Sequence, residues 1–434
     1  MENTKIISKI TTKNYRNLVN EDGVVLNNLN ILIGSNGSGK SNFVALLEFF
    51  KNCLTPSPDL DSRGITAFEN AVSKLRYNIL DSLIKKPAKV SLEFEFLNLH
   101  PLSEITFFLA LYIDNSFSAT SVAIAEESLQ QTKPKTDSEV PFVYYRSHDK
   151  QSGCGIVSVN NKNKNGSSFH KLSQHISVAE LSLLEIPKLL IEEGTFYPEQ
   201  VPLYKIRNDL SETVKKWQFY NANEMDLAKI RGERPKVGSS DVILAKSGEN
   251  MPAVLDNLSN HIKYGIDFDE RINNAMKDIL PMTKRIKTSR EGMSLTVRWY
   301  LDGMEEPFYL DDMSDGTVRM LCWATILHSP ILPTLLVIDE PELSLHIAWM
   351  GILANWIKQA SQKTQIIIST HSPDLLDYFT DCAGDVICFE KTQPKGHFKA
   401  QKLPEAIIKD KIAEGWQLGD LYRTGDDIIG GWPW

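Results

Sequence analysis

Apolar residues follow two periodicities along the chain, and each predicts a different kind of element. Residues 90–97 alternate between buried-type and polar side chains, which is typical of a half-buried strand, with apolar positions at Val90, Leu92, Phe94 and Phe96. Residues 29–33 and 335–338 are short, mostly apolar runs, as in strands buried on both faces. Further strands are expected at residues 105–113 and 140–145, with a polar stretch at about 130–139 between them.

Helical periodicity predicts the remaining elements. Residues 42–51 place four apolar side chains on one helical face, namely Phe43, Leu46, Leu47 and Phe50. A second helix is expected at residues 318–327, and residues 176–280 are helical in pattern. Six prolines are expected to cap helices of moderate length in and after that stretch, namely Pro187, Pro198, Pro202, Pro235, Pro252 and Pro281.

Strands alternate with helices at both ends of the chain, which indicates an α/β fold. A low-complexity polar segment at residues 160–168 is expected to mark a lobe boundary. We therefore expect five parts: an N-terminal part of the α/β body (residues 1–55), a β-rich part with loops (56–175), an inserted helical lobe (176–290), a C-terminal part of the body (291–400) and a tail (401–434).

Composition narrows the class of protein. The chain has 434 residues, 42% of them apolar, and a formal net charge of −8, which argues against coating nucleic acid with the whole surface but allows a local basic patch. Its five cysteines form no C-x-x-C pair, so reduced thiols are expected rather than a structural zinc site. The N-terminus lacks a signal-peptide core and no apolar run is long enough to cross a bilayer, so we expect a cytoplasmic protein with no membrane contact.

A glycine-rich loop lies between the strand at residues 29–33 and the helix at residues 42–51. Its sequence has the spacing G-x-x-x-x-G-K-S and consists of Gly34, Ser35, Asn36, Gly37, Ser38, Gly39, Lys40 and Ser41. Glycines let backbone N–H groups turn towards an anion, and the helix N-terminus adds positive potential. Lys40 can reach the β- and γ-phosphates, and the hydroxyl of Ser41 can bind magnesium. The loop predicts binding of a nucleoside triphosphate with Mg²⁺, and a plain helix-capping turn is the weaker interpretation.

Two later strands end in polar side chains. Residues 335–338 lead to Asp339 and Glu340, where Asp339 can hold magnesium and Glu340 can polarise or deprotonate the attacking water. The apolar strand at 366–368 leads to His371, whose neutral imidazole can bind a γ-phosphate oxygen. Between the loop and these strands, Ser314 is expected to cap the helix at residues 318–327, with backbone N–H groups at a helix start.

The order of these motifs resembles the ABC-type ATPase head, in its RecF/SMC/OLD-like branch. The resemblance covers roughly residues 1–52 and 290–395, with the loop at 34–41 similar to the Walker A motif and residues 335–340 to the Walker B motif. Residues 313–317, Met-Ser-Asp-Gly-Thr, are similar to the signature, residues 341–346 to the D-loop, and His371 to the switch histidine. The resemblance implies a mixed sheet with an antiparallel β subdomain and an inserted mainly helical lobe.

The resemblance also implies roles for single residues. Lys40, Glu340 and His371 would act in catalysis, and Ser41 and Asp339 would hold Mg²⁺. Residues expected to contact ATP are Arg16 of the first hairpin, the whole loop from Gly34 to Ser41, Asn42, and the signature-like residues Ser314, Asp315 and Gly316. The family mechanism implies a homodimer in which ATP lies between two heads and the signature-like residues act on the nucleotide of the partner.

Three functions of different classes follow from this resemblance. The first is an ATPase that acts as an ATP-gated switch in DNA repair or anti-phage defence, with a separately encoded effector. The second is a regulatory ATP-binding module that controls a toxin or nuclease with slow turnover. The third, a transporter ATPase subunit, fits poorly because of the large insert and the Ser-Asp-Gly-Thr signature. About sixty residues follow His371, too few for the nuclease domain of OLD-like relatives, so no intrinsic nuclease is expected.

Nucleic acid is a further candidate partner. The densest basic run of the chain lies just before the signature-like residues and contains Lys284, Arg285, Lys287 and Arg290. Such a run is more often a solvated face, and its alternative role is contact with DNA phosphates.

Overall fold

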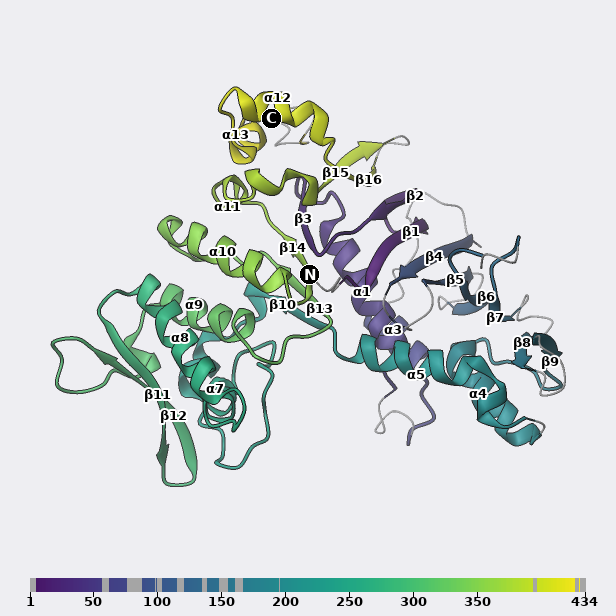
Figure 1. The fold of residues 1–434 in the computed structure, drawn as a ribbon, viewed down its shortest axis with the longest axis horizontal. Coiled ribbons are helices and arrows are strands. Elements are labelled where there is room, and N and C mark those ends of the chain that lie inside the picture. The colour runs from purple at the N-terminus through teal and green to yellow at the C-terminus, as the bar shows by residue number, and fades with distance from the viewer. Residues whose placement is uncertain are drawn as a thin grey trace. The chain divides into compact units, whose positions relative to one another are not determined.

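The computed structural model describes residues 5–56, 62–75, 88–97, 99, 104–114, 121–134, 139–147, 155–160, 167–194, 196–392, 396–425 and 429. The chain divides into two compact units, whose elements are labelled in Figure 1. Unit 1 consists of Met1–Asn27, Ile33–Trp217 and Ile387–Leu403. Unit 2 consists of Asn28–Leu32, Gln218–Val386 and Pro404–Trp434.

A parallel sheet forms the centre of unit 2. Its strands are β10 (Gln218–Asn221), β13 (Leu335–Asp339), β14 (Gln365–Ser369) and β3 (Leu29–Ile33), in that order. All five residues of β3 and of β14 are buried, as expected for parallel strands covered on both faces. The register pairs Asn221 with Asp339, Asp339 with Ser369, and Ser369 with Leu32, so four strands end at one edge.

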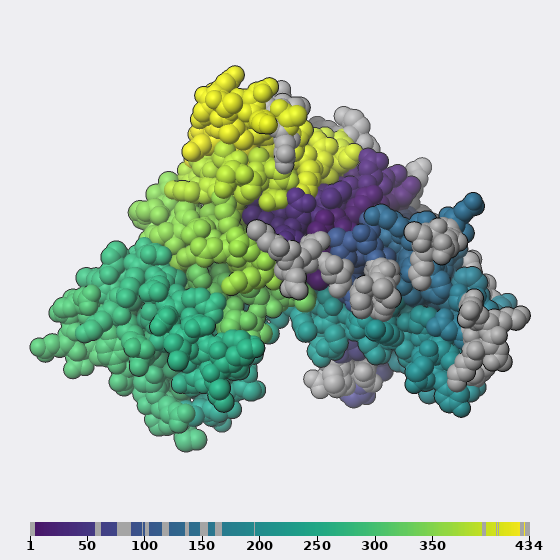
Figure 2. Space-filling view, viewed as in Figure 1, coloured from purple at the N-terminus to yellow at the C-terminus, as the bar shows by residue number. Residues whose placement is uncertain are grey.

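Helices and a hairpin complete unit 2. The helices are α6 (Leu227–Gly232), α7 (Met251–Ser259), α8 (Gly265–Ile279), α9 (Asp315–Leu327), α10 (Met350–Ser361), α11 (Pro373–Asp377), α12 (Glu405–Ala413) and α13 (Leu418–Thr424), and the short 3-10 turns are η2 (Ala222–Glu224), η3 (Leu310–Asp312), η4 (Ile347–Trp349) and η5 (Thr380–Asp385). The hairpin of β11 (Thr283–Glu291) and β12 (Ser294–Leu301) packs on α7 and α8, and its tip projects from the unit (Figure 2).

Unit 1 is built on a largely antiparallel sheet. Its order is β15 (Val386–Thr392), β16 (His397–Lys402), β2 (Leu18–Val25), β1 (Ile7–Tyr15), β4 (Ala88–Phe96), β5 (Ile105–Asp114), β6 (Ser121–Gln131), β7 (Val143–Ser147), β8 (Gly155–Asn160) and β9 (Ser167–Lys171). Only β16 and β2 run parallel among these neighbours.

The core of unit 1 forms where α1 (Lys40–Leu54) covers this sheet. Phe50 lies 4.3 Å from Phe94, 5.2 Å from Phe107 and 5.9 Å from Trp217, measured between ring centroids. The other helical elements of the unit are α3 (Ala67–Lys74), α4 (Ser182–Glu193), α5 (Pro202–Lys215) and the 3-10 turn η1 (Pro198–Gln200). The aromatic cluster holds α1, and with it the preceding loop, against the sheet.

The predicted α/β fold is confirmed, together with several of its elements. β3, β4 and β5 match the predicted strands, and α1 and α9 match the predicted helices. The predicted apolar face of α1 is buried at Phe43, Leu46, Leu47 and Phe50. Cys322 and Cys388 lie in the core and are 0% and 1% exposed.

Other elements differ from the expectation. Gln130 and Gln131 belong to strand β6, which the sequence pattern did not reveal, and the strand expected from residue 140 begins at Val143. Pro187 lies inside α4 rather than at its end, whereas Pro202 starts α5. Residues 161–166 of the expected low-complexity loop lie outside the described residues.

The compact units do not follow the expected domain borders. Residues 176–290 are not one helical lobe, because α4 and α5 belong to unit 1 while α6, α7 and α8 belong to unit 2. The division falls between Trp217 and Gln218, immediately before β10 enters the parallel sheet. Among the described residues, no helix combines the length and apolarity needed to cross a membrane.

Candidate nucleotide site

The glycine-rich loop follows β3 directly and leads into α1. The Nζ of Lys40 donates to the carbonyl oxygens of Gly34, at 2.7 Å, and of Ser35, at 3.3 Å, and the residue is only 5% exposed. Gly39 precedes α1 with φ of 103° and supplies no side-chain cap. No side chain of the N-cap residue therefore accepts a hydrogen bond from the backbone N–H groups of the first helical turn. Such N–H groups at a helix start bind anions.

Two glycines of the loop are required by its geometry. Gly39 has a positive φ, and a Cβ there would lie 2.6 Å from the side chain of Leu18. A Cβ on Gly34 would lie 2.9 Å from Ser38 Oγ, and φ of 147° at this residue also disfavours a side chain. Within the described part of the chain, Ser38 Oγ is buried and has no hydrogen-bond partner. A bound phosphate would supply one.

The turn between β1 and β2 is tied to this loop. Arg16 Nη1 donates to Asn42 Oδ1 at 2.7 Å, and Asn42 Nδ2 donates to Asn17 Oδ1 at 2.7 Å. Asn17 in turn donates to the carbonyl oxygen of Gly37 at 3.0 Å. Arg16 thus lies beside the first turn of α1, and the side chain of Asn42 is hydrogen-bonded to the hairpin.

Asp339 lies at the carboxyl edge of the parallel sheet in unit 2 and is held from both neighbouring strands. Asn221 Nδ2 donates to Asp339 Oδ2 at 2.8 Å, and the hydroxyl of Ser369 donates to Asp339 Oδ1. Two donors from the neighbouring strands fix the plane of the carboxylate. Asp339 therefore has the chemistry of a magnesium ligand in the strand position that the sequence predicted.

Glu340 and His371 lie close together at the same edge. His371 Nε2 is 3.7 Å from Glu340 Oε1, with 25% and 33% of the two side chains exposed. Asn223 Nδ2 donates to Glu340 Oε2 at 3.3 Å, and the backbone N of Glu340 donates to Ser369 O at 3.0 Å. Glu340 adopts a φ of 51°, an uncommon conformation that turns the chain sharply after β13.

Glu342 connects the loop after β13 to the segment after β14. Its Oε1 accepts from the hydroxyl of Thr370 at 2.6 Å and from the backbone N of His371 at 3.0 Å. Burial raises the pKa of this carboxyl, and the bond from Thr370 opposes the shift. Glu342 therefore fixes the backbone that carries the His371 ring.

The signature-like segment starts α9, as predicted. Ser314 caps the helix by accepting from Thr317 N at 3.2 Å, and Asp315 pairs with Arg231 at 2.8 Å. Arg231 also donates to Met313 O at 2.7 Å. A Cβ on Gly316 would lie 2.9 Å from the Trp349 ring, so the start of α9 packs tightly on the region after the predicted D-loop.

Several of these residues were not found from the sequence. Asn221 is the last residue of the short strand β10 and Asn223 follows it, inside a stretch that looked helical. The preceding pair Phe219–Tyr220 is the signal that could have indicated a strand. Arg231 and Glu342 carry no local signal for their contacts. All four act by holding Asp339, Glu340, His371 or the segment before α9.

The residues present fit magnesium and a nucleoside triphosphate. In unit 1, the buried Lys40, the Ser38 hydroxyl without a hydrogen-bond partner and the uncapped start of α1 suit phosphate groups. In unit 2, the carboxylate of Asp339 is an oxygen ligand of the kind that a hard cation prefers. In the described parts of the chain, no group of three or more His, Cys, Asp or Glu side chains forms a separate metal cluster.

A protein-family profile matches residues 163–377, about half of the chain. Its description is "AAA domain, putative AbiEii toxin, Type IV TA system". The matched region contains the Ser314 turn, the Asp339–Glu340 strand end and His371, and the glycine-rich loop precedes it in the order typical of these heads. The chain thus has the fold and the motif order of an ABC-type P-loop ATPase head.

Solved structures similar to this ATPase head are SMC head domains. They are an SMC head bound to the C-winged helix domain of ScpA (14% identity, TM-score 0.48), an SMC head from Thermotoga maritima (11%, 0.40) and an SMC head with an extended coiled coil bound to the C-terminal domain of ScpA derived from Pyrococcus furiosus (13%, 0.45). The likenesses cover 93%, 91% and 94% of this chain and 99%, 97% and 99% of the others. Likenesses of this size carry no conclusion about activity or partners. A search of curated protein sequences gives no match.

Proposed function

We propose that this ATPase head binds ATP with Mg²⁺ and hydrolyses it. The observation that carries the proposal is the loop at residues 34–41, in which Lys40 is buried against two loop carbonyls at an uncapped helix start. Lys40 would release these carbonyls and bind the β- and γ-phosphates instead.

The carboxylates of unit 2 supply the remaining chemistry. Ser41 and Asp339 would hold Mg²⁺, which neutralises phosphate charge when bound. Glu340 would orient the attacking water and accept its proton. His371 would donate a hydrogen bond to a γ-phosphate oxygen, and its position 3.7 Å from Glu340 supports a shared role at that group.

ATP would also drive dimerisation of the heads. Ser314 and Asp315 are exposed at the start of α9, and 63% of the Asp315 side chain is accessible. Exposed N–H groups and a hydroxyl at a helix start are available to a phosphate brought by another copy of the chain. We propose that Ser314, Asp315 and Gly316 act on the nucleotide of the partner, so that ATP favours the closed dimer.

The output of this cycle is an ATP-gated switch in DNA repair or anti-phage defence, acting through a separately encoded effector. A regulatory module that controls a toxin or nuclease with slow turnover is the second candidate, and the toxin–antitoxin description of the matching family favours it. The two differ in output rather than in site. Co-purification with a partner whose release depends on ATP, together with slow turnover, would favour the second.

The test is the replacement of Lys40. Lys40→Ala is expected to abolish ATP binding measured by calorimetry, and hydrolysis with it. Lys205→Ala, an exposed lysine on α5, is the matched control and should bind like the wild type. Retained affinity in Lys40→Ala would refute the assignment of the loop.

A further inference from the structure

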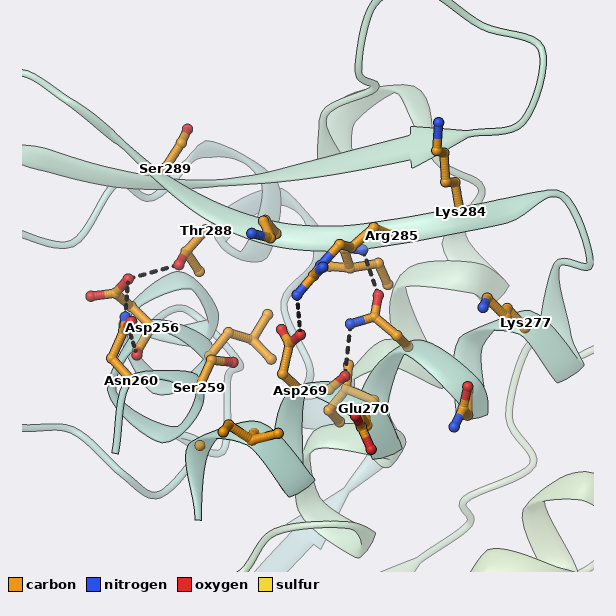
Figure 3. Close-up of a pocket in the computed structure, with 18 of the residues that line it drawn as sticks. Asp256, Ser259, Asn260, Asp269, Glu270, Lys277, Lys284, Arg285, Thr288 and Ser289 are labelled. Carbon is orange, nitrogen blue, oxygen red and sulfur yellow. Dashed lines mark hydrogen bonds and ion pairs between the residues drawn. The ribbon is translucent and has the colours of Figure 1, made fainter. Parts of the chain in front are cut away.

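An open groove of about 680 Å³ lies in unit 2 between α7, α8 and β11 (Figure 3). One wall is β11, which carries the basic run of the sequence. The other wall comes from the two helices and carries Asp256, Asp269 and Glu270. In Figure 3, Lys277 and Lys284 lie towards one end of the groove, and Asp256 and Thr288 towards the other.

The cations of the groove are mostly unpaired. Lys277, Lys284, Lys287 and Arg290 are exposed, and none has an ion pair or hydrogen bond with a described residue. Arg285 is the exception, because it pairs with Asp269 at 2.7 Å. The β11 wall thus presents concentrated positive charge on a chain whose net charge is −8.

Two of the three acidic residues in the groove are already engaged. Asp269 holds Arg285, and Asp256 accepts from the hydroxyl of Thr288 at 2.7 Å and from Asn260 at 3.1 Å. Only Glu270 remains to offset four free cations. The local excess is therefore positive, and an anionic ligand would meet little repulsion along β11.

The hairpin also carries a like-charge pair. Lys287 lies directly opposite Arg298 in the antiparallel register of β11 and β12. Like charges directly opposite on neighbouring strands destabilise a hairpin. Arg298 has Glu291 at 3.7 Å, whereas Lys287 has no acidic neighbour within ion-pair distance in the described chain. A bound anion would relieve this repulsion.

The spacing of the cations suits an extended polyanion. Lys284 and Arg290 lie six residues apart on one strand, which is roughly 20 Å at about 3.3 Å per residue. A nucleic-acid strand carries one phosphate per about 3.4 Å of helix axis, so this length faces several consecutive phosphates. A single small anion would leave most of these cations unused.

We propose that the β11 wall of this groove binds the phosphate backbone of nucleic acid without reading its sequence. Lys284, Lys287 and Arg290 contact phosphates, and Lys277 adds charge from α8. Contacts of this type depend on charge and salt rather than on bases. The inference rests on the charges of unit 2 and not on the proposed ATP chemistry.

The test compares two triple variants with the same change of net charge. One is Lys284→Gln/Lys287→Gln/Arg290→Gln. The control is Lys205→Gln/Lys215→Gln/Lys216→Gln, at exposed positions on α5 and at its C-cap. Binding of a labelled duplex of about 20 base pairs is measured by fluorescence anisotropy between about 50 and 200 mM salt. Melting temperature and ATP turnover are measured for each protein to verify folding and to separate this proposal from the ATPase proposal.

The groove variant should bind the duplex at least about tenfold more weakly than the wild type. Its slope of log K against log salt should be shallower by roughly 2 to 3, because each phosphate contact that is lost reduces the slope by about 0.9. The control should stay close to the wild type. Equal affinity of the groove variant and the control for the duplex would overturn the proposal. So would a wild-type protein that does not bind the duplex, or whose binding does not change with salt. Neither result would bear on Lys40 and ATP.

Discussion

Glu342 Oε1 lies 3.0 Å from the backbone nitrogen of His371 and accepts a hydrogen bond from it. The same oxygen accepts from the Thr370 hydroxyl at 2.6 Å. One carboxylate in the loop after β13 thus holds the turn after β14. Since His371 lies 3.7 Å from Glu340, the carboxylate also sets the distance between the two groups proposed to act at the γ-phosphate.

Replacing Glu342 tests this positioning role. Glu342→Ala leaves the two donors of Thr370 and His371 unsatisfied, and kcat for ATP hydrolysis should fall by about tenfold or more, or about 1.4 kcal/mol, with KM nearly unchanged. Glu342→Gln keeps an acceptor oxygen and should restore most of the rate. Equal loss in both variants would mean that charge at Glu342, and not its hydrogen bonds to the turn, is what the site requires.

Asn221 should matter through Asp339. Its Nδ2 donates to Asp339 Oδ2 at 2.8 Å, and removing a group that orients a metal ligand typically costs about 10- to 100-fold in metal affinity. Asn221→Ala should therefore raise the Mg²⁺ concentration needed for half-maximal ATP hydrolysis by about tenfold. Asn208→Ala, on the exposed side of α5, is the control. An unchanged magnesium requirement would contradict the proposal that Asp339 binds the cation.

Ser314 should have a role beyond capping α9. Loss of an N-cap costs about 1 kcal/mol of stability, and Thr66→Ala removes a comparable cap from α3. Ser314→Ala should lower ATP turnover strongly while ATP binding by the monomer stays intact. Thr66→Ala should lose only stability, measured by thermal melting. Matching effects of both variants on turnover would show that Ser314 is merely a cap.

His328 gives a pH prediction for the fold itself. Burial, aided by Arg271 and Lys363, lowers the pKa of His328 to about 4. The unfolded chain binds this proton near pH 6.5, so the stability contributed by neutral His328 is present above that pH and is lost as pH falls towards 4. His328→Gln should flatten the fall of melting temperature between these values. His175→Gln, at an exposed position, should retain the slope of the wild type, and a slope unchanged in both variants would contradict the assignment.

The parts of the site that were predictable from sequence are contiguous motifs whose function depends on local geometry. The loop at residues 34–41, the cap at Ser314 and the buried strands before Asp339 and His371 each contain their own signal, since glycines, a capping hydroxyl and short apolar runs determine backbone shape nearby. These elements appear in the structure where they were expected.

The unpredicted parts depend on tertiary pairing. β10 has four residues and only two buried side chains, and it becomes a strand because β13 offers a parallel edge. Asn221 reaches Asp339 only through that pairing, 118 positions away in sequence. The contacts of Glu342 and Arg231 likewise join segments whose spacing follows no local rule. Pro187 is tolerated within α4, although its local signal is that of a helix end.

The measurement that tests the central claim most directly is the molar mass of Glu340→Gln with and without saturating Mg·ATP. This change keeps the loop and Asp339 but removes the proposed base, so ATP should remain bound and the 49.0 kDa chain should shift to twice its mass in sedimentation or light scattering, while hydrolysis slows by orders of magnitude. A protein that stays at the monomer mass and turns over ATP at the wild-type rate would contradict the account.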